Sequence, residues 1–319
     1  MDLTKLNAGE RARGGAFDPL FKALCAASAT FVLISLGGVV LSLAIGGWPA
    51  FHKFGLAFLT TSQWNPVTEV YGAAGPIVGT IISSALALLL SWPIAVGIAV
   101  FLVEFCPKAL SRPIAIAVEL LAGIPSIVYG MWGLFVLAPF FAEHVQLPLM
   151  AAAPEGSWIG GLIQGVPNGA NIFTASLILA LMILPYMAAV FRELFMTVPQ
   201  SVRESAYALG STPLETITKV VMPYVGRGAI GVTMLGLGRA LGETMAVTFI
   251  IGNTHGFPKS LFDSGSTIAS TIANEFAEAT SDMHTSALIA LGLVLFMITF
   301  AVLAVARALL SAQRYSGGG

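Results

Sequence analysis

The chain has few charged residues. Only 10% of its 319 residues are Asp, Glu, Lys or Arg, whereas 56% are hydrophobic and the mean hydropathy is +0.87. Soluble domains contain about 25% charged residues, so this composition excludes an ordinary globular protein. The net charge is −1. No basic surface of the kind that binds nucleic acid is indicated, and we expect no nucleic-acid partner.

Cysteine and nucleotide-binding motifs are also scarce. Cys25 and Cys106 lie in no CxxC or Cys/His cluster, which argues against a disulfide framework, a zinc site and a thiol enzyme. The sequence has no G-x-x-x-x-G-K-[ST] motif, and its nearest imitation, GRALGET at 238–244, lacks the lysine. We therefore expect no catalytic residues, no cofactor and no ATP hydrolysis by this chain.

Long apolar segments are what the sequence has in abundance. A transmembrane helix needs about 20 predominantly apolar residues. Six segments qualify, at about 21–46, 76–103, 113–141, 172–191, 229–252 and 285–310. The sequence therefore predicts an all-α integral membrane protein with a short N-terminal segment at 1–20 and a transmembrane domain at 21–319.

The basic residues indicate how these spans are oriented. Of the 15 Lys and Arg residues, twelve lie at the amino terminus, after the second span, after the fourth span or in the tail. The alternate loops carry only Lys53 and Lys259, and the remaining residue is Arg239. Loops rich in Lys and Arg stay in the cytoplasm. Both termini are therefore predicted to be cytoplasmic.

Proline and hydroxyl side chains interrupt the apolar spans. Pro93, Pro125 and Pro185 each predict a kink, because proline lacks the N–H that continues a helix. Thr80 and Ser84 share one face of the second span, and Ser126 and Tyr129 follow Pro125. These four polar side chains either line a transport pathway or hydrogen-bond between helices.

Two segments are predicted on the outer side of the membrane. Residues 142–171 are rich in Gly and Pro and contain no Lys or Arg, and we expect a loop there. Residues 266–279 show helical spacing of apolar residues with Ser266 as the expected N-cap, which predicts a short amphipathic helix. Glu275 and Glu278 would make this rim acidic.

Two charges lie inside the fifth predicted span. Arg239 and Glu243 fall near the midplane, where each charge costs about 2.5–3.5 kcal/mol. The apolar residues of the span return roughly 4 kcal/mol in all, so neither charge can face lipid. Their spacing of four places both on one face of a continuous helix. They form either a buried ion pair or an anion site, in which the Arg guanidinium donates to an oxyanion and Glu accepts a hydrogen bond from a protonated oxygen of that anion.

The loop at 204–223, ESAYALGSTPLETITKVVMP, carries the most specific motif. It resembles the EAA loop of permeases of type I (MetI-like) ABC importers. Glu204, Ala206, Gly210 and Pro223 fit that spacing, whereas Ser205 stands where the family usually has a second alanine. The resemblance implies a MetI-like permease fold and a contact with a separate ATPase through this loop.

The residues of this loop also predict its shape. Residues 201–209 can form a short helix that ends at Gly210 in a left-handed conformation. Ser211 or Thr212 can then start a second helix with Pro213 in its first turn. Such an elbow is compact enough to dock into a groove on a cytoplasmic partner.

Three further stretches narrow the resemblance. Residues 235–253, 119–135 and 274–279 are similar to phosphate-specific permeases of the PstC type. This resemblance implies a phosphate importer in a bacterial cytoplasmic membrane. It would contain a second homologous permease, two ATP-binding subunits and a periplasmic phosphate-binding protein, and a regulator of phosphate signalling is a further partner that the family suggests.

Two other functions compete with this interpretation. A related permease could carry sulfate or molybdate, although Glu243 would repel a fully deprotonated dianion. A secondary transporter driven by an ion gradient would need neither the EAA-like loop nor an ATPase.

Overall fold

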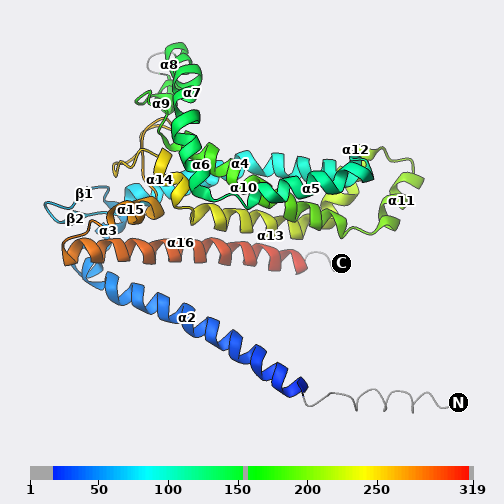
Figure 1. The fold of residues 1–319 in the computed structure, drawn as a ribbon, viewed down its shortest axis with the longest axis horizontal. Coiled ribbons are helices and arrows are strands. Elements are labelled where there is room, and N and C mark those ends of the chain that lie inside the picture. Colours follow the sequence, from blue (N-terminus) through cyan, green and yellow to red (C-terminus); the bar gives the residue numbers. More distant parts are fainter. Residues whose placement is uncertain (1–16, 154–156, 316–319) are drawn as a thin grey trace.

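The computed structural model describes residues 17–153 and 157–315, and within them the chain is mostly helical (Figure 1). The predicted N-terminal segment 1–20 therefore lies almost wholly outside the described residues. The first half of the chain forms α2 (Phe17–Phe54), α3 (Ala57–Thr60), β1 (Trp64–Asn65), β2 (Val70–Tyr71), α4 (Ala74–Val100), the π-helical turn η1 (Phe101–Phe105), α5 (Lys108–Ala122), α6 (Ser126–Trp132), η2 (Gly133–Leu137), α7 (Ala138–Phe141), η3 (Ala142–Gln146), α8 (Leu147–Ala152) and α9 (Trp158–Ile163). The second half forms α10 (Ile172–Met196), α11 (Gln200–Ala208), α12 (Pro213–Thr216), η4 (Ile217–Val221), α13 (Met222–Leu241), α14 (Met245–Ile250), α15 (Ile268–Glu275) and α16 (Asp282–Tyr315).

The long helices α4, α5, α10, α13 and α16 lie side by side as a bundle (Figure 1). We call the end that carries α11 and α12 the elbow end, and the end that carries β1, β2 and α15 the hairpin end. The segment α6–α9 leaves the bundle as an arm, and α2 diverges from it. The amino end of α2 and the carboxyl end of α16 lie on the elbow side, as expected if both termini and the elbow face one compartment.

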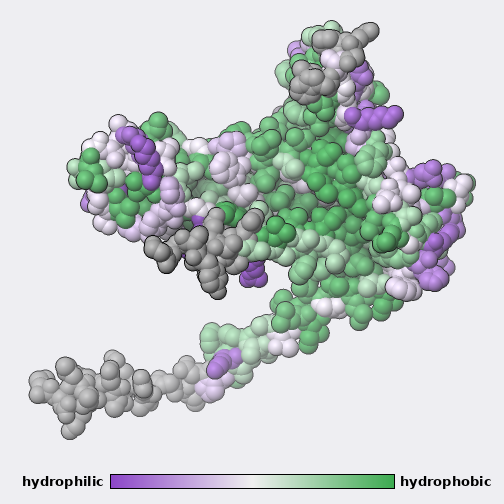
Figure 2. Space-filling view, turned by 180° about the vertical axis from the view of Figure 1, so that it is seen from behind, coloured by the Kyte–Doolittle hydropathy of each residue, from purple (hydrophilic) through white to green (hydrophobic). Residues whose placement is uncertain are grey.

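Among the described residues, six helices are long and apolar enough to cross a membrane. They are Pro19–Phe54, Ala74–Phe105, Ser126–Ala152, Ile172–Met196, Pro213–Leu241 and Asp282–Ala308. The first, second, fourth and sixth coincide with predicted spans. Figure 2 shows a hydrophobic surface over the middle of the bundle and along α2, with hydrophilic residues gathered at the ends and on the arm. This distribution fits a membrane protein that meets water at both ends.

The third and fifth spans were predicted wrongly. The segment 113–141 is not one helix, because α5 ends at Ala122 and a new helix begins after Pro125, whose φ of −57° and ψ of 136° are not helical. The predicted loop at 142–171 is partly helical, because the apolar segment that begins at Ser126 continues to Ala152. The fifth span begins in the elbow and stops at Leu241, not at residue 252. By contrast, α4 and α10 continue through Pro93 and Pro185.

The main hydrophobic core surrounds α10. In the most apolar 18 residues of α10, 67% are buried, a larger share than in any other span described. Its buried side chains, among them Ile178, Ile183 and Phe191, pack against α4, α13 and α14. Small residues such as Ala87 and Ala95 on α4 let the two helices approach closely. The pair α4–α10 is therefore the rigid centre to which the other elements attach.

A second core lies at the hairpin end. Phe58, Tyr71 and Ile268 pack there against Leu288 and Leu291 of α16. This core holds α3, the two-stranded hairpin and α15 together, and it fixes the end of α2 against α16. The predicted outer helix is present as α15, but its N-cap is Thr267 and not Ser266, because the Thr267 side chain accepts a hydrogen bond from the Ser270 N–H at 3.1 Å.

Candidate functional site

The elbow is built from two short helices joined by a left-handed glycine. At the end of α11 the Ser211 N–H donates to the Ala206 carbonyl at 3.1 Å, and the Gly210 N–H donates to the Tyr207 carbonyl at 2.9 Å. This is the Schellman pattern of a helix terminus. Gly210 has φ +87°, a conformation that a β-carbon disfavours. The predicted left-handed conformation of Gly210 is confirmed.

The second helix of the elbow is fixed by a capping box. The Thr212 hydroxyl accepts from the Glu215 N–H at 3.3 Å, and the Glu215 carboxylate accepts from the Thr212 N–H at 3.1 Å. Pro213 occupies the first helical position, where its missing N–H costs nothing. The expected start of a second helix with Pro213 in its first turn is therefore confirmed, with Thr212 as the N-cap.

The outer surface of the elbow combines polar and apolar side chains. Glu204 and Ser205 are exposed, whereas Ala206 turns inward and is buried. Leu209 is 88% exposed and Leu214 is 68% exposed on either side of Gly210. Pro223, the last motif residue, is exposed at the start of α13. Exposed leucines at the hydrophilic end of the bundle mark a surface that a protein partner can cover.

One buried arginine attaches the elbow to the bundle. The Arg203 Nε donates to Glu104 Oε1 at 3.0 Å, and its two terminal nitrogens donate to the carbonyls of Val198 and Phe195. Both charged side chains are largely buried, with 15% of Arg203 and 10% of Glu104 exposed. No pattern in the sequence indicates this pair, because 99 residues separate its members.

Helices α6 and α14 pack closely where they cross. A β-carbon on Gly130 of α6 would lie 2.9 Å from Ala246 Cα of α14, and one on Gly133 would lie 2.9 Å from the Ile250 side chain. Residue numbers increase in both segments from the first contact to the second, so the two segments run in the same direction along the chain. Both begin directly after a break, at 123–125 and 242–244. The two breaks therefore lie within about one helical turn of each other.

Arg239 lies directly before the second break and Glu243 lies within it, so they do not share a helix. Arg239 lies exposed in the last turn of α13, and its guanidinium carbon is 5.7 Å from the centre of the Tyr186 ring. Glu243 lies half-buried in the break, where its Oε1 accepts from the Ala246 N–H at 3.3 Å. The expectation that both lie on one face of a continuous helix is wrong, because Gly242 ends α13. Among the described residues no ion pair joins the two charges.

The four predicted hydroxyl residues fall into two groups. Thr80 and Ser84 are buried, the Thr80 hydroxyl donating to the Pro76 carbonyl at 2.7 Å and accepting from the Ile268 N–H at 2.9 Å. Ser84 donates to the Thr80 carbonyl at 2.6 Å. Ser126 and Tyr129 are half-buried on α6 beside the first break. The first group packs between α4 and α15, whereas the second group lies beside the first break, where the Tyr129 hydroxyl donates to the Leu121 carbonyl at 3.0 Å.

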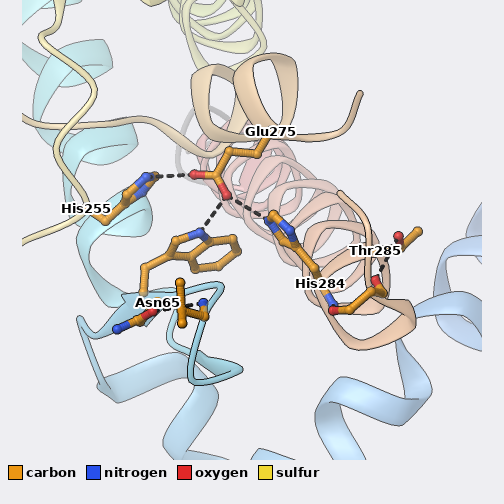
Figure 3. A network of polar contacts seen from close by, with 8 residues as sticks. Asn65, His255, Glu275, His284 and Thr285 are labelled. Carbon is orange, nitrogen blue, oxygen red and sulfur yellow. Dashed lines mark hydrogen bonds and ion pairs between the residues drawn. The ribbon is translucent and has the colours of Figure 1, made fainter. Parts of the chain in front are cut away.

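A carboxylate at the hairpin end accepts three hydrogen bonds (Figure 3). Glu275 contacts the Nε2 atoms of His255 and His284 at 2.7 and 2.8 Å, and its Oε2 accepts from Trp64 Nε1 at 2.7 Å. Burial tends to raise the pKa of Glu275, but the hydrogen bonds from His255, Trp64 and His284 outweigh it and hold the pKa below its ordinary value. Glu275 therefore stabilises the hairpin end and is not a free charge of an acidic rim.

The three residues that contact Glu275 come from three separate parts of the chain. Trp64 lies on β1, His255 in the loop after α14, and His284 on the first turn of α16. The Trp64 ring stacks on His255 with centroids 5.6 Å apart, and the Tyr71 ring stacks on His284 at 5.3 Å. No spacing in the sequence joins these residues. Only the aromatic and histidine content of otherwise polar loops hints at them.

The chain is similar to known transport proteins over most of its length. Residues 93–315 match the family model described as the binding-protein-dependent transport system inner membrane component. The phosphate transport system permease protein PstC of Mesorhizobium japonicum is 54% identical over 294 residues, which cover 92% of this chain and 90% of that protein. The protein of the same name from Pasteurella multocida is 52% identical, with 91% of each chain covered.

A solved structure shares the fold at low sequence identity. A chain in the crystal structure of a bacterial alginate ABC transporter, in complex with an alginate pentasaccharide-bound periplasmic protein, has a TM-score of 0.61 and 17% identity. The similarity covers 95% of this chain and 96% of that chain. Because the matched family region begins at residue 93, it includes the elbow, Arg239 and Glu243 but not Thr80 or Ser84.

Proposed function

Because this chain belongs to the binding-protein-dependent transport system inner membrane component family, we propose that it is a permease subunit of an ATP-driven phosphate importer. Two observations together support the proposal. The chain is 52–54% identical to phosphate permeases over about nine tenths of its length, and it carries the capped elbow at 200–216. The elbow favours ATP-driven transport over a gradient-driven carrier, which has no use for a docking surface of this kind.

The proposed assembly follows from what one chain lacks. A second homologous permease would complete the pathway, two ATP-binding subunits would dock on the elbows, and a periplasmic phosphate-binding protein would deliver the substrate. The exposed residues Glu204, Ser205, Leu209 and Leu214 would contact the ATPase, with Ala206, Gly210 and Pro223 setting the shape of the elbow. The elbow side would then be cytoplasmic, together with both termini.

The proposed phosphate pathway passes the two helix breaks. No hydrogen bond or ion pair within the described residues engages the Arg239 guanidinium, so its donors remain available for an oxyanion. Glu243, four residues further along the chain, can accept a hydrogen bond from a protonated phosphate oxygen and would repel a fully deprotonated dianion. Ser126 and Tyr129 lie beside the other break and can contact the passing ion. Thr80 and Ser84 would support this pathway by packing rather than by contact.

The experiment is uptake of labelled phosphate into vesicles that contain the complete complex and trapped ATP. We expect uptake that requires both the binding protein and a hydrolysis-competent ATPase. Uptake driven by an ion gradient without the ATPase would refute ATP-driven transport. Preferential uptake of sulfate or molybdate would refute the proposed substrate.

Variants of the two charges test the pathway. Because the charges are not paired with each other, Arg239→Ala and Glu243→Ala should each assemble yet lose most phosphate uptake. Glu243→Gln should keep uptake but let sulfate compete more strongly, because the repulsive charge is gone. Full uptake in assembled Arg239→Ala would exclude Arg239 from the pathway.

A further inference from the structure

The contact between Arg203 and Glu104 joins three elements at the elbow end. Arg203 lies on α11 directly before the exposed motif residue Glu204. Its Nε reaches Glu104 at 3.0 Å, and its terminal nitrogens reach the carbonyls of Val198 and Phe195 at 2.5 and 2.8 Å. One guanidinium therefore ties the elbow helix to the end of α10 and to the turn η1 that ends α4.

This ion pair is buried, unlike the others near the elbow. Lys219 and Glu215 form an exposed pair at 2.9 Å on the elbow itself, and Arg192 approaches the half-exposed Glu119 at 3.8 Å. Water screens exposed pairs, so they hold their elements loosely. A buried pair is screened less, and separating it leaves a charge without a partner. The Arg203–Glu104 contact therefore resists being pulled apart when α11 moves.

The turn that carries Glu104 collects further contacts. The Ser111 hydroxyl of α5 donates to the Leu102 carbonyl within η1 at 2.8 Å. At the opposite end of α4, the Thr80 hydroxyl accepts from the backbone of α15 at Ile268. The rigid helix α4 therefore links the elbow end to the hairpin end, and Glu104 lies where α11 meets it.

No other side chain of α11 forms a hydrogen bond or ion pair to α4 or α10 within the described residues. Pro199 and Gly210 lie at the two ends of α11, where the helical backbone is interrupted on both sides. Without Arg203, no side-chain hydrogen bond would tie α11 to the end of α10 or to η1.

We propose that Arg203 and Glu104 are positioning residues that pass a displacement of the elbow to the α4–α10 pair. This inference rests on the proposed function, because it requires an ATPase at the elbow. Neither residue contacts the substrate. Their role is to keep the elbow and the membrane helices moving as one body, so that ATP hydrolysis and transport stay coupled.

The test measures phosphate transported per ATP hydrolysed in the complete reconstituted complex. We expect Arg203→Gln and Glu104→Gln to lower this ratio by roughly tenfold, within the range that single residues exert on coupling between distant sites. Arg203→Lys should be intermediate, because Lys keeps the charge but lacks the fork that reaches three acceptors. Lys219→Gln, which breaks only the exposed pair, should leave the ratio unchanged.

A double variant separates coupling from stability. Arg203→Met with Glu104→Leu removes both charges and leaves none buried alone, so the complex should assemble even where a single variant does not. We expect this double variant to hydrolyse ATP but to transport poorly. A normal ratio in the double variant would overturn the proposal, and so would its failure to assemble, since the pair would then be structural.

A second readout is independent of the substrate. With Cys25 and Cys106 replaced by serine, a single cysteine at the exposed Ile127 reports motion near the break through its labelling rate. Nucleotide should change that rate in the otherwise unaltered complex but not in the Arg203→Gln complex. If the complex with Arg203 and Glu104 intact hydrolysed ATP without taking up phosphate, the proposed substrate would be refuted. The labelling experiment would still test whether Arg203 and Glu104 couple the elbow to the membrane helices.

Discussion

Replacing Gly210 with valine should weaken binding of the ATPase without harming the membrane domain. A β-branched residue at φ +87° costs about 1–2 kcal/mol or more, because its Cβ meets the following carbonyl. Nothing lies within 4 Å of a Cβ built at Gly210, so backbone strain is the whole effect and no clash adds to it. If the ATPase binds the elbow in this conformation, its affinity should fall by roughly 5- to 30-fold.

The matched control is Gly210→Asn, which is similar in size but tolerates the left-handed conformation. Binding of the purified ATPase to the permease in lipid nanodiscs would be titrated for both variants. We expect the asparagine variant to bind almost as the original chain does. Equal affinities for the valine and asparagine variants would refute the argument from backbone conformation.

The remaining predictions concern the hairpin end, the helix crossing and the orientation. Because the pKa of Glu275 is held below its ordinary value of 4.5, its contacts stabilise the fold above that pH and are lost below it. Glu275→Gln should therefore destabilise the complex by about 1–3 kcal/mol at pH 7 in thermal unfolding, with the difference shrinking in acid. Gly130→Ala should cost about 1–3 kcal/mol because its Cβ meets Ala246, whereas Gly231→Ala, with open space around it, should not. Cysteines at the exposed positions Val67 and Leu209 should be labelled from opposite sides of the membrane, and labelling from one side would refute the orientation.

The elbow was predictable because its structure is local. Gly210, Thr212 and Pro213 each act on the backbone within one turn, so their order along the chain is enough to specify a capped break between two helices. The four simple spans were predictable for a similar reason, since a long apolar run needs no partner to be recognised. The prediction of an all-α membrane protein from the sequence depended on these two local features, the capping residues of the elbow and the long apolar runs.

The breaks in the third and fifth spans were missed because hydropathy does not distinguish a continuous helix from an interrupted one. Pro125 was read as a kink, but with Gly123 before it the chain leaves the helix altogether. Gly242 likewise ends α13, although it lies within an apolar run that continues to residue 252.

The polar clusters at the two ends of the bundle could not be predicted at all. Glu275 meets Trp64 across 211 positions in the sequence, and Arg203 meets Glu104 across 99. Such contacts depend on how the helices pack, which a single sequence does not reveal. A buried charge is a reason to look for a partner, but it does not identify that partner.

The break at Gly242 accounts for the two charges that a lipid-facing helix could not hold. Where a membrane helix stops, its last carbonyls and the next N–H groups lose their helical partners, so protein or water must satisfy them. The same polar surroundings lower the cost of a nearby charge. Arg239, Glu243 and the break therefore require one shared polar region rather than three separate ones. The break before α6 lies within about one helical turn of the break at Gly242, so this polar region extends to Ser126 and Tyr129. We therefore propose that the phosphate path passes between the two breaks and not along a single helix.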